Sequence, residues 1–523
     1  MKNNRFSSNL SGFHESTESA PLVNKWVVAI TVMFGAFMSV MDLSVVNVAM
    51  PHMMGGFSED ISSITWVATS YSIAEIILIS MTGWLTTLIG RKRLYLFSFG
   101  LFTVGSVLCG TATTFYQMLL YRAIQGVGGG ALLPVSQAIL RESFPPEEQG
   151  IAMSIFGMGV MLAPAIGPMV GGWLTDHFGW PWIFYINIPF SIVGIFMVWT
   201  FVHDPGYLKR GIQKIDWGGI LLMSVSLTTM QIVFERGERE NWFESHMIII
   251  GTAVCILSLI ALVYWELKIR EPIINFRLLK NLSLSLGSVM GLVFSVALYG
   301  VTFVIPQLTQ NLQGYPAFQA GMVLAPRALM LIMFMPIVGR LYNHVEARWL
   351  VLVGVLITFW SYYDLSRLSL NAGFWNFVPM LLIMGAGMPF IFVTLSTVSL
   401  STISRPQMTE ASSLYTLARR VGGNIGYAMA ATIVSHSQQV HRVVLAGYVN
   451  AFSPLTTEYR RAASAIVNHR GFCPQELQHV LNALISMVVN RHATMMAYND
   501  TSLVFGVLFL CTIPLALMLP TRK

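Results

Sequence analysis

The chain has 523 residues, of which 54% are hydrophobic and only 11% are charged, and its mean hydropathy is +0.64. This balance excludes a soluble globular protein and indicates a chain that crosses the membrane many times. The net charge of +7 is typical of a membrane protein whose basic residues gather on one side, so it does not indicate nucleic-acid binding.

Fourteen apolar stretches are each long enough to cross about 30 Å of hydrocarbon, which takes about 20 residues in a helix. They fall into groups of six, two and six along the chain, and they predict an all-α polytopic membrane protein. The expected spans are 26–50, 62–89, 94–112, 115–140, 149–175, 181–202, 216–234, 246–266, 283–310, 317–339, 348–366, 376–402, 409–436 and 498–519.

The basic residues predict the orientation, because Lys and Arg in short loops are retained on the cytoplasmic side. With the N-terminus inside, the cytoplasmic segments hold nineteen of the 31 basic residues, whereas the short outer loops hold only Arg236, Arg239 and Arg367. We therefore expect both termini in the cytoplasm. The first apolar run is too long for a removed signal peptide and lacks a small-residue cleavage site, so we expect the first span to be retained.

Asp42 lies in MDLSVVNVAMP at the end of the first span, and Arg122 lies in the fourth span with Gln125 three residues later. A charge near mid-bilayer costs several kcal/mol, so such residues usually face a bundle interior or a wet cavity. A carboxylate there can change its protonation with its surroundings, which is what proton coupling requires. The alternative for both residues is a static ion pair between helices.

The second span carries another interior acid, Glu75, with Tyr71 one turn earlier on the same helical face. We expect Glu75, Tyr71 and Gln125 to line a substrate cavity. Contact of Glu75 with a cationic substrate and a silent structural pairing are equal alternatives.

Metal and cofactor sites are not indicated. Cys109, Cys255 and Cys511 fall in expected spans and Cys473 alone lies in the outer segment, so we expect neither a disulfide nor a Cys/His metal site. The glycines of QGVGGGALLP, residues 125–134, lie inside a span without the Lys-Ser/Thr of a phosphate loop. We therefore expect no metal, no cofactor and no ATP-driven transport.

Two segments share a repeated frame of Gly-x-Leu, eight residues and Leu: GWLTTLIGRKRL from Gly83 and GRLYNHVEARWL from Gly339. Such a repeat suggests two related halves around a central substrate path. In the fifth span, GMGVMLAPAIGPMVGG from Gly157 has little side-chain bulk, which permits close helix contact and local bending. Helix packing alone is an equally good explanation of these glycines.

These motifs, in this order, resemble the fourteen-span drug:proton antiporters of the major facilitator superfamily, the EmrB/QacA type. The resemblance also rests on LLYRAIQGVGGGALLP from Leu119, GYPAFQAGMVLAPRALMLIMFMPIVGRL from Gly314 and EASSLYTLARRVGGNIG from Glu410. It implies a major facilitator fold of two six-helix halves with two extra central spans. The implied parts are a cytoplasmic tail 1–25, an N-terminal half 26–202, a linker 203–282 with the extra spans, a C-terminal half 283–519 with an outer segment 437–497, and a cytoplasmic end 520–523.

The resemblance implies proton coupling by Asp42, Arg122 and Glu235. Glu235 stands in FERGERENWF at the outer end of the seventh span, where a solvated charge cluster is the alternative. Thr87 replaces the aspartate on which a charge relay depends in the wider superfamily. The residues that the resemblance assigns to conformational motifs are Gly83, Gly90, Arg91, Lys92, Arg93, Gly159, Pro164, Gly167, Pro168, Gly171, Gly172 and Arg327.

The outer segment contains PQELQHVLNALISMVVNRH, residues 474–492, whose apolar residues share one helical face. A periplasmic adaptor protein and an outer-membrane channel are the partners that the resemblance implies for it. Packing against the segment's own neighbouring helices is the alternative, because an amphipathic stripe cannot separate the two.

Together these features predict a proton-coupled antiporter of the bacterial inner membrane that exports small amphipathic or toxic compounds. Its partners are then a small-molecule substrate, protons and the lipid bilayer, although sodium remains open as the coupling ion. The alternative is a dedicated exporter of one metabolite, such as a siderophore or fatty acid. A membrane-embedded enzyme is less favoured, because the histidines lie mostly in loops or at span ends.

Overall fold

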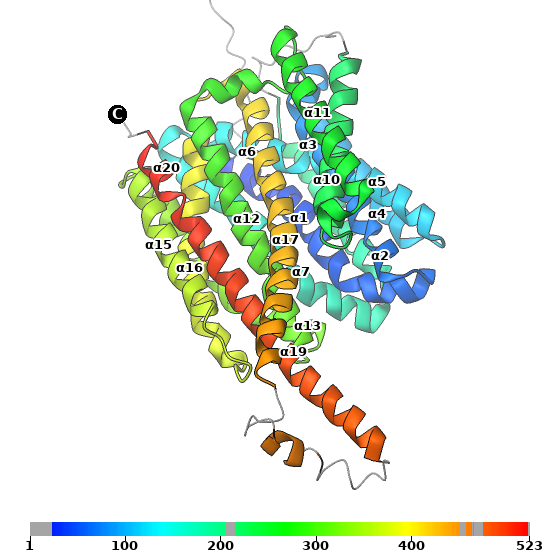
Figure 1. Cartoon of the computed structure of the whole chain (residues 1–523). Helices are drawn as coiled ribbons and strands as arrows, with labels where there is room; N and C mark the ends of the chain where they lie inside the picture. Colours follow the sequence, from blue (N-terminus) through cyan, green and yellow to red (C-terminus); the bar gives the residue numbers. More distant parts are fainter. Residues whose placement is uncertain (1–23, 205–214, 450–456, 463, 465–473, 521–523) are drawn as a thin grey trace, which may run out of the picture.

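The computed structural model describes residues 24–204, 215–449, 457–462, 464 and 474–520. Over these residues the chain is a bundle of long helices without a strand (Figure 1). The predicted all-α fold is confirmed.

The helices form two bundles and a hairpin. The N-terminal bundle comprises α1 (Lys25–Phe57), α2 (Ile61–Ile64), α3 (Trp66–Ile89), α4 (Arg91–Gly110), α5 (Phe115–Gly130), α6 (Leu132–Ser143), α7 (Gln149–Phe178), α8 (Trp182–Tyr185) and α9 (Asn187–Phe201). The hairpin comprises α10 (Trp217–Arg236) and α11 (His246–Lys268). The C-terminal bundle comprises α12 (Leu282–Asn311), α13 (Ala317–Val323), α14 (Ala325–Leu341), α15 (Ala347–Leu365), α16 (Phe374–Ser399), α17 (Met408–Gly447), α19 (Pro474–Leu510) and α20 (Ile513–Leu517).

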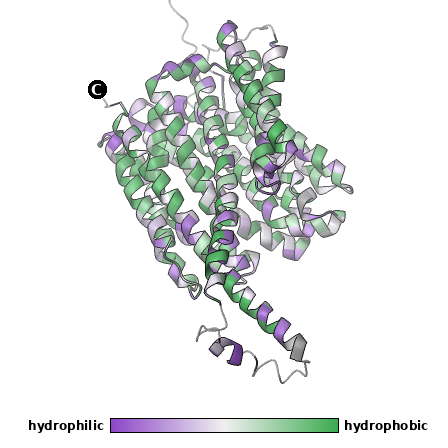
Figure 2. Ribbon diagram, viewed as in Figure 1, coloured by the Kyte–Doolittle hydropathy of each residue, from purple (hydrophilic) through white to green (hydrophobic). Residues whose placement is uncertain are grey.

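Within the described residues, 12 helical stretches are long and apolar enough to cross a membrane. The two expected spans outside this set, 348–366 and 409–436, are the helices α15 and α17, which lie among the others in the bundle (Figure 1). Figure 2 shows hydrophobic residues along most of the bundle, as expected for helices that face lipid.

Five expected spans are interrupted rather than continuous. Two breaks, at Thr65 and at Cys511–Thr512, separate α2 from α3 and α19 from α20. In the other three spans the helix breaks at Ala131 between α5 and α6, at Ile186 between α8 and α9, and at Leu324 between α13 and α14. A proline follows each of these three breaks by two or three residues, and proline lacks the N–H that would continue the helix. These residues are Pro134, Pro189 and Pro326.

The helices of the last two expected spans extend well beyond the expected bounds 409–436 and 498–519. α17 continues from the bundle to Gly447, and α19 begins at Pro474, so much of the expected outer segment 437–497 is helical (Figure 1). The two extensions contact each other through Gln438 and Asn490, at 3.1 Å. Apolar and polar residues alternate along the projecting part of α19 (Figure 2), in agreement with the amphipathic helix predicted there.

The two bundles meet closely at the end of the molecule that carries Lys25. Arg91 Nε donates to Thr409 Oγ1 at 2.9 Å, and Ser413 Oγ donates to the carbonyl of Ile79. A Cβ on Gly83 would lie 2.9 Å from the Cα of Glu410, so α3 and α17 touch backbone to backbone. These contacts close the Lys25 end between the bundles.

The glycines of the fifth expected span allow α7 to approach α1 equally closely. A Cβ on Gly159 would lie 2.8 Å from Met33 Cγ, and one on Gly167 would lie 2.5 Å from Ser44 Cβ. Gly171 faces the backbone of Val45 in the same way. The next glycine, Gly172, and both Pro164 and Pro168 belong to this same helix. The structure therefore places these motif residues on a helix that packs tightly against α1.

The close contact between α4 and α5 yields a stability test. A Cβ on Gly128 of α5 would lie 2.3 Å from the backbone nitrogen of Phe102, whereas one on Gly100 of α4 would meet nothing within 4 Å. Gly128→Ala should therefore lower the free energy of unfolding by about 1–3 kcal/mol, the usual cost of overpacking. Gly100→Ala should leave stability unchanged or raise it by up to about 1 kcal/mol, because alanine favours helix.

Thermal unfolding of both purified variants in detergent measures this difference. Equal melting temperatures for the two variants would contradict the packing of α5 on α4.

Candidate functional site

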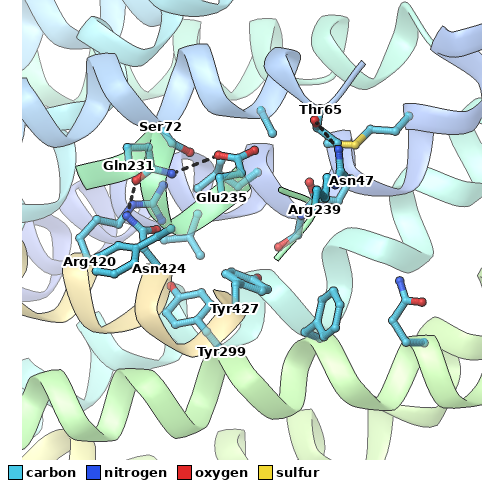
Figure 3. Close-up of a pocket in the computed structure, with 18 residues that line it drawn as sticks. Asn47, Thr65, Ser72, Gln231, Glu235, Arg239, Tyr299, Arg420, Asn424 and Tyr427 are labelled. Carbon is cyan, nitrogen blue, oxygen red and sulfur yellow. Dashed lines mark hydrogen bonds between the residues drawn. The ribbon is translucent and has the colours of Figure 1, made fainter. Parts of the chain in front are cut away.

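A cavity of about 380 Å³ lies between the two bundles and the hairpin (Figure 3). Its walls come from α1, α3, α10, α12 and α17, in each case from the part of the helix remote from the Lys25 end. The lining combines amide, hydroxyl, charged and aromatic side chains, a mixture suited to amphipathic molecules. The lining residues are Val40, Leu43, Ser44, Asn47, Met50, Thr65, Ala68, Ser72, Gln231, Phe234, Glu235, Arg239, Tyr299, Phe303, Gln307, Arg420, Asn424 and Tyr427.

A chain of hydrogen bonds runs along one cavity wall and joins α10 to both bundles. Asn424 of α17 donates to Gln231, and Gln231 donates to Glu235 at 3.3 Å. The other oxygen of Glu235 accepts from Thr69 of α3. Figure 3 shows Gln231 between Asn424 and Glu235. The hairpin therefore forms part of the cavity itself.

Asp42 and Arg122 form a fully buried ion pair beside this cavity. Arg122 Nη1 lies 2.6 Å from Asp42 Oδ2, and Arg122 and Asp42 are 0% and 1% exposed, respectively. The other oxygen, Oδ1, accepts from Gln125 at 2.8 Å and from Asn187 at 2.9 Å. The sequence interpretation thus placed Asp42, Arg122 and Gln125 in spans that the fold brings together, but it missed Asn187.

Aromatic rings cover the guanidinium of Arg122. Its centre lies 4.3 Å from the ring of Tyr71 and 5.7 Å from that of Phe184, while Nε donates to the carbonyl of Val67 at 3.1 Å. Nη2 is buried and has no hydrogen-bond partner. The pair is therefore enclosed by protein, and a proton or cargo can reach it only after the bundle moves.

Glu75 pairs with Arg420 of α17, which joins the two bundles beside the cavity. Its carboxylate is buried, and its other oxygen lies 3.4 Å from Ser39 Oγ. Neither Glu75, Tyr71 nor Gln125 lines the cavity, contrary to the position expected from sequence. The reason is helical geometry: Ser72 faces the cavity, and Tyr71 and Glu75 lie on a neighbouring face of α3 that turns toward the buried pair.

Arg420 is the residue that the sequence interpretation left without a role. An arginine within an apolar span was itself a signal, because its charge requires a partner or water. Its partner, Glu75, belongs to the other bundle and lies 345 positions away in the chain. No local sequence pattern therefore reveals the pair.

Glu235 lines the cavity, as does Arg239 from the charged stretch that follows it. Arg236 lies over the ring of Trp66 at 4.8 Å, and Arg239 donates to Thr65 at 3.0 Å. Among the described residues, no hydrogen bond or ion pair joins Glu235 to Asp42 or Arg122. Three carboxylates of this region, Asp42, Glu75 and Glu235, therefore have separate sets of partners.

The basic motif at the start of α4 has three different environments. Gly90 adopts a positive φ of 90°, which lets α4 begin directly after α3. Arg91 is buried and pairs with Glu142 as well as binding Thr409, so it supports the closed end. Lys92 donates from its backbone to Asp204 at 2.8 Å, whereas Arg93 is exposed.

Arg327 belongs to the C-terminal bundle and is 1% exposed. Its Nη1 lies 3.4 Å from Thr302 Oγ1, and its Nε has no partner.

Over the described part of the chain, no group of three or more His, Cys, Asp or Glu side chains could hold a metal ion.

The family model of the Major Facilitator Superfamily matches residues 32–427. The chain is 32% identical over 428 residues to the multidrug export protein EmrB of Haemophilus influenzae, which covers 81% of this chain and 83% of that protein. It is 27% identical over 491 residues to the fatty acid resistance protein FarB of Neisseria gonorrhoeae, covering 94% and 95%. The proton:xylose symporter XylE has a similar fold, with a TM-score of 0.60 and 12% identity, over 95% of this chain and 96% of that structure.

The buried pair yields a test by double-mutant cycle. Asp42→Asn and Arg122→Gln should each lower the free energy of unfolding by about 3–5 kcal/mol, because each leaves one buried charge without its partner. The double variant should lose at least about 1 kcal/mol less than the sum of the two.

Chemical and thermal unfolding of the three purified variants provide these values. Asp42→Asn combined with Arg327→Gln serves as the control, and its effects should add because Arg327 lies in the other bundle. Additive losses for Asp42 and Arg122 would mean that the pair contributes no coupling energy.

Proposed function

This chain belongs to the major facilitator superfamily, and we propose that it exports small amphipathic compounds across a bacterial inner membrane in exchange for protons. The observation that carries the proposal is a cavity between two bundles whose contacts close the Lys25 end of the molecule. Its relatives named as multidrug export proteins support efflux as the direction of transport.

In this proposal the Lys25 end faces the cytoplasm, as the distribution of basic residues predicts. The structure then corresponds to an outward-facing state, in which Arg91, Thr409, Ser413 and Gly83 seal the cytoplasmic side. Transport requires the reverse state, in which these contacts separate and the cavity opens inward. The contacts at Gly83 are well suited to such a separation, because they are van der Waals contacts and not hydrogen bonds.

Asp42 is the proposed proton site, and Arg122 is its partner. Asp42 lies on α1 between Val40 and Leu43, which both line the cavity, so cargo and the ion pair act on the same helix. A proton on Asp42 would remove the charge that holds Arg122, and α1 would then be free to change its packing. Loading of a proton and loading of cargo are thereby linked through α1.

The extensions of α17 and α19 are a proposed outer surface. A periplasmic adaptor and an outer-membrane channel remain the partners proposed for it. The contacts Gln438–Asn490 and His441–Asp500, at 3.1 and 2.6 Å, support the alternative in which the extensions pack on each other.

Export of one metabolite is the second candidate. The relative named a fatty acid resistance protein covers nearly the whole chain and favours an apolar acid as such a metabolite.

Asp42→Asn should abolish proton-driven transport in proteoliposomes, with a loss of at least about 100-fold, because an amide cannot carry the proton. Asp364→Asn, on a carboxylate at the end of α15, is the matched control and should retain transport. Uptake of a fluorescent cargo by inside-out vesicles under an imposed pH gradient measures both. An active Asp42→Asn variant would disprove the coupling role.

The closed end gives a second test. A Cβ on Gly83 would lie 3.2 Å from Glu410 Cβ, near the spacing of about 3.8 Å found in disulfides. Gly83→Cys with Glu410→Cys, in a chain whose native cysteines are replaced by serine, should form a disulfide on oxidation and lower transport at least about 10-fold. Reduction should restore it, and each single variant should be insensitive to oxidant. Full activity of the cross-linked protein would contradict opening at this end.

A further inference from the structure

Three charged residues line the cavity: Glu235, Arg239 and Arg420. Both oxygens of Glu235 already accept hydrogen bonds, from Thr69 and Gln231. Arg239 follows the end of α10 and donates to Thr65. Arg420 differs from both, because it pairs with Glu75, which does not line the cavity.

The guanidinium of Arg420 is only partly used. Nη2 donates to Glu75, but Nε is buried without a partner. The side chain of Arg420 is 13% exposed and that of Glu75 is 1% exposed, so the arginine stands between the carboxylate and the cavity. A planar guanidinium with a free Nε–H edge is the group that best receives a second carboxylate.

The surroundings of Arg420 fit the rest of an amphipathic anion. Asn424 lies one turn further along α17 and also lines the cavity (Figure 3). The rings of Tyr299 and Tyr427 lie 5.6 Å apart, and Phe303 lies 6.2 Å from Tyr427. Polar groups therefore stand next to an aromatic wall, as an apolar body with one charged head requires.

We propose that the preferred cargo of this cavity is an amphipathic organic anion whose carboxylate binds Arg420 and displaces Glu75 from it. This assignment rests on the proposed export function, which it narrows to a substrate class. The sequence left contact with a cationic substrate and a structural pairing as equal alternatives for Glu75, and the proposal departs from the first because Glu75 pairs with Arg420 and does not line the cavity.

The displacement has a consequence for protons. The charged and titratable groups near Glu75 are Tyr71 on its own helix, Asp42 on α1, Arg122 on α5 and Arg420 on α17. Asp42 already neutralises Arg122, so a displaced Glu75 has no other cation. An unpaired buried carboxylate is costly, and one proton from cavity water restores neutrality. Binding of one anion should therefore take up about one proton.

Three probes with the same ring system separate the alternatives: 2-naphthoate, 2-(aminomethyl)naphthalene and 2-naphthalenemethanol. Calorimetry of the full-length protein at pH 7 in buffers of different ionisation enthalpy gives affinity and proton uptake. Wild type should bind naphthoate at least 5-fold more tightly than the alcohol, with uptake of about one proton.

Variants test the two residues in opposite directions. Arg420→Gln should weaken naphthoate binding at least 10-fold and leave the alcohol within 3-fold, which also shows that the variant is folded. Glu75→Gln should strengthen naphthoate binding and abolish proton uptake, because Arg420 is then free before binding. Arg367→Gln, the control at an exposed arginine that does not line the cavity, should change naphthoate binding less than 3-fold.

Naphthoate affinity that is unchanged in Arg420→Gln would overturn the assignment. Preference of wild type for the amine would also overturn it and would direct attention to Glu235. Transport of the same probes in proteoliposomes separates the proposed anionic cargo from the proposed export function. Export of the amine or alcohol without naphthoate binding would disprove the anionic cargo alone. Naphthoate binding without transport of any probe would disprove the export function alone.

Discussion

The structure depends on keeping two opposite charges, Asp42 and Arg122, inside a bundle that excludes water. The remaining oxygen of Asp42 accepts hydrogen bonds from Gln125 of α5 and Asn187 of α9, while Nη2 of Arg122 is buried without a partner. The glycines of α5 make room for this arrangement. A Cβ on Gly126 would lie 2.4 Å from the carbonyl of Tyr71, and one on Gly129 would lie 2.3 Å from its hydroxyl. The small residues of this bundle therefore allow the close helix packing that encloses the charged residues.

A second pair, Glu75 and Arg420, repeats this arrangement across the two bundles. The first pair lies within the N-terminal bundle and persists when the bundles move as rigid bodies, whereas the second pair must adjust when they move. The molecule thus has one ion pair within a bundle and another ion pair between the bundles, and the geometry of the second depends on the distance between the bundles.

Much of the fold was readable from the sequence, because each span must satisfy its backbone hydrogen bonds as a helix and its length is fixed by the bilayer. The breaks at Ala131 and Leu324 and the continuation of α17 to Gly447 were not predicted. Asp42 and Arg122 were recognised because an interior charge is conspicuous in an apolar run. Asn187 and Arg420 were assigned no role, since their partners lie far away in the chain and hydropathy carries no information about pairing.

The α10–α11 hairpin has a consequence for access from the lipid. α10 packs against α3 and α17, where the two bundles would otherwise meet the membrane, and α11 lies on its outer side. One lateral seam of the cavity is thereby covered by protein. The opposite seam, between α7 and α14, has no such cover among the described helices. The extra helices therefore make the two seams between the bundles different: the hairpin covers one, and α7 and α14 close the other by packing directly on each other, with a Cβ on Gly150 falling 2.3 Å from the carbonyl oxygen of Gly339.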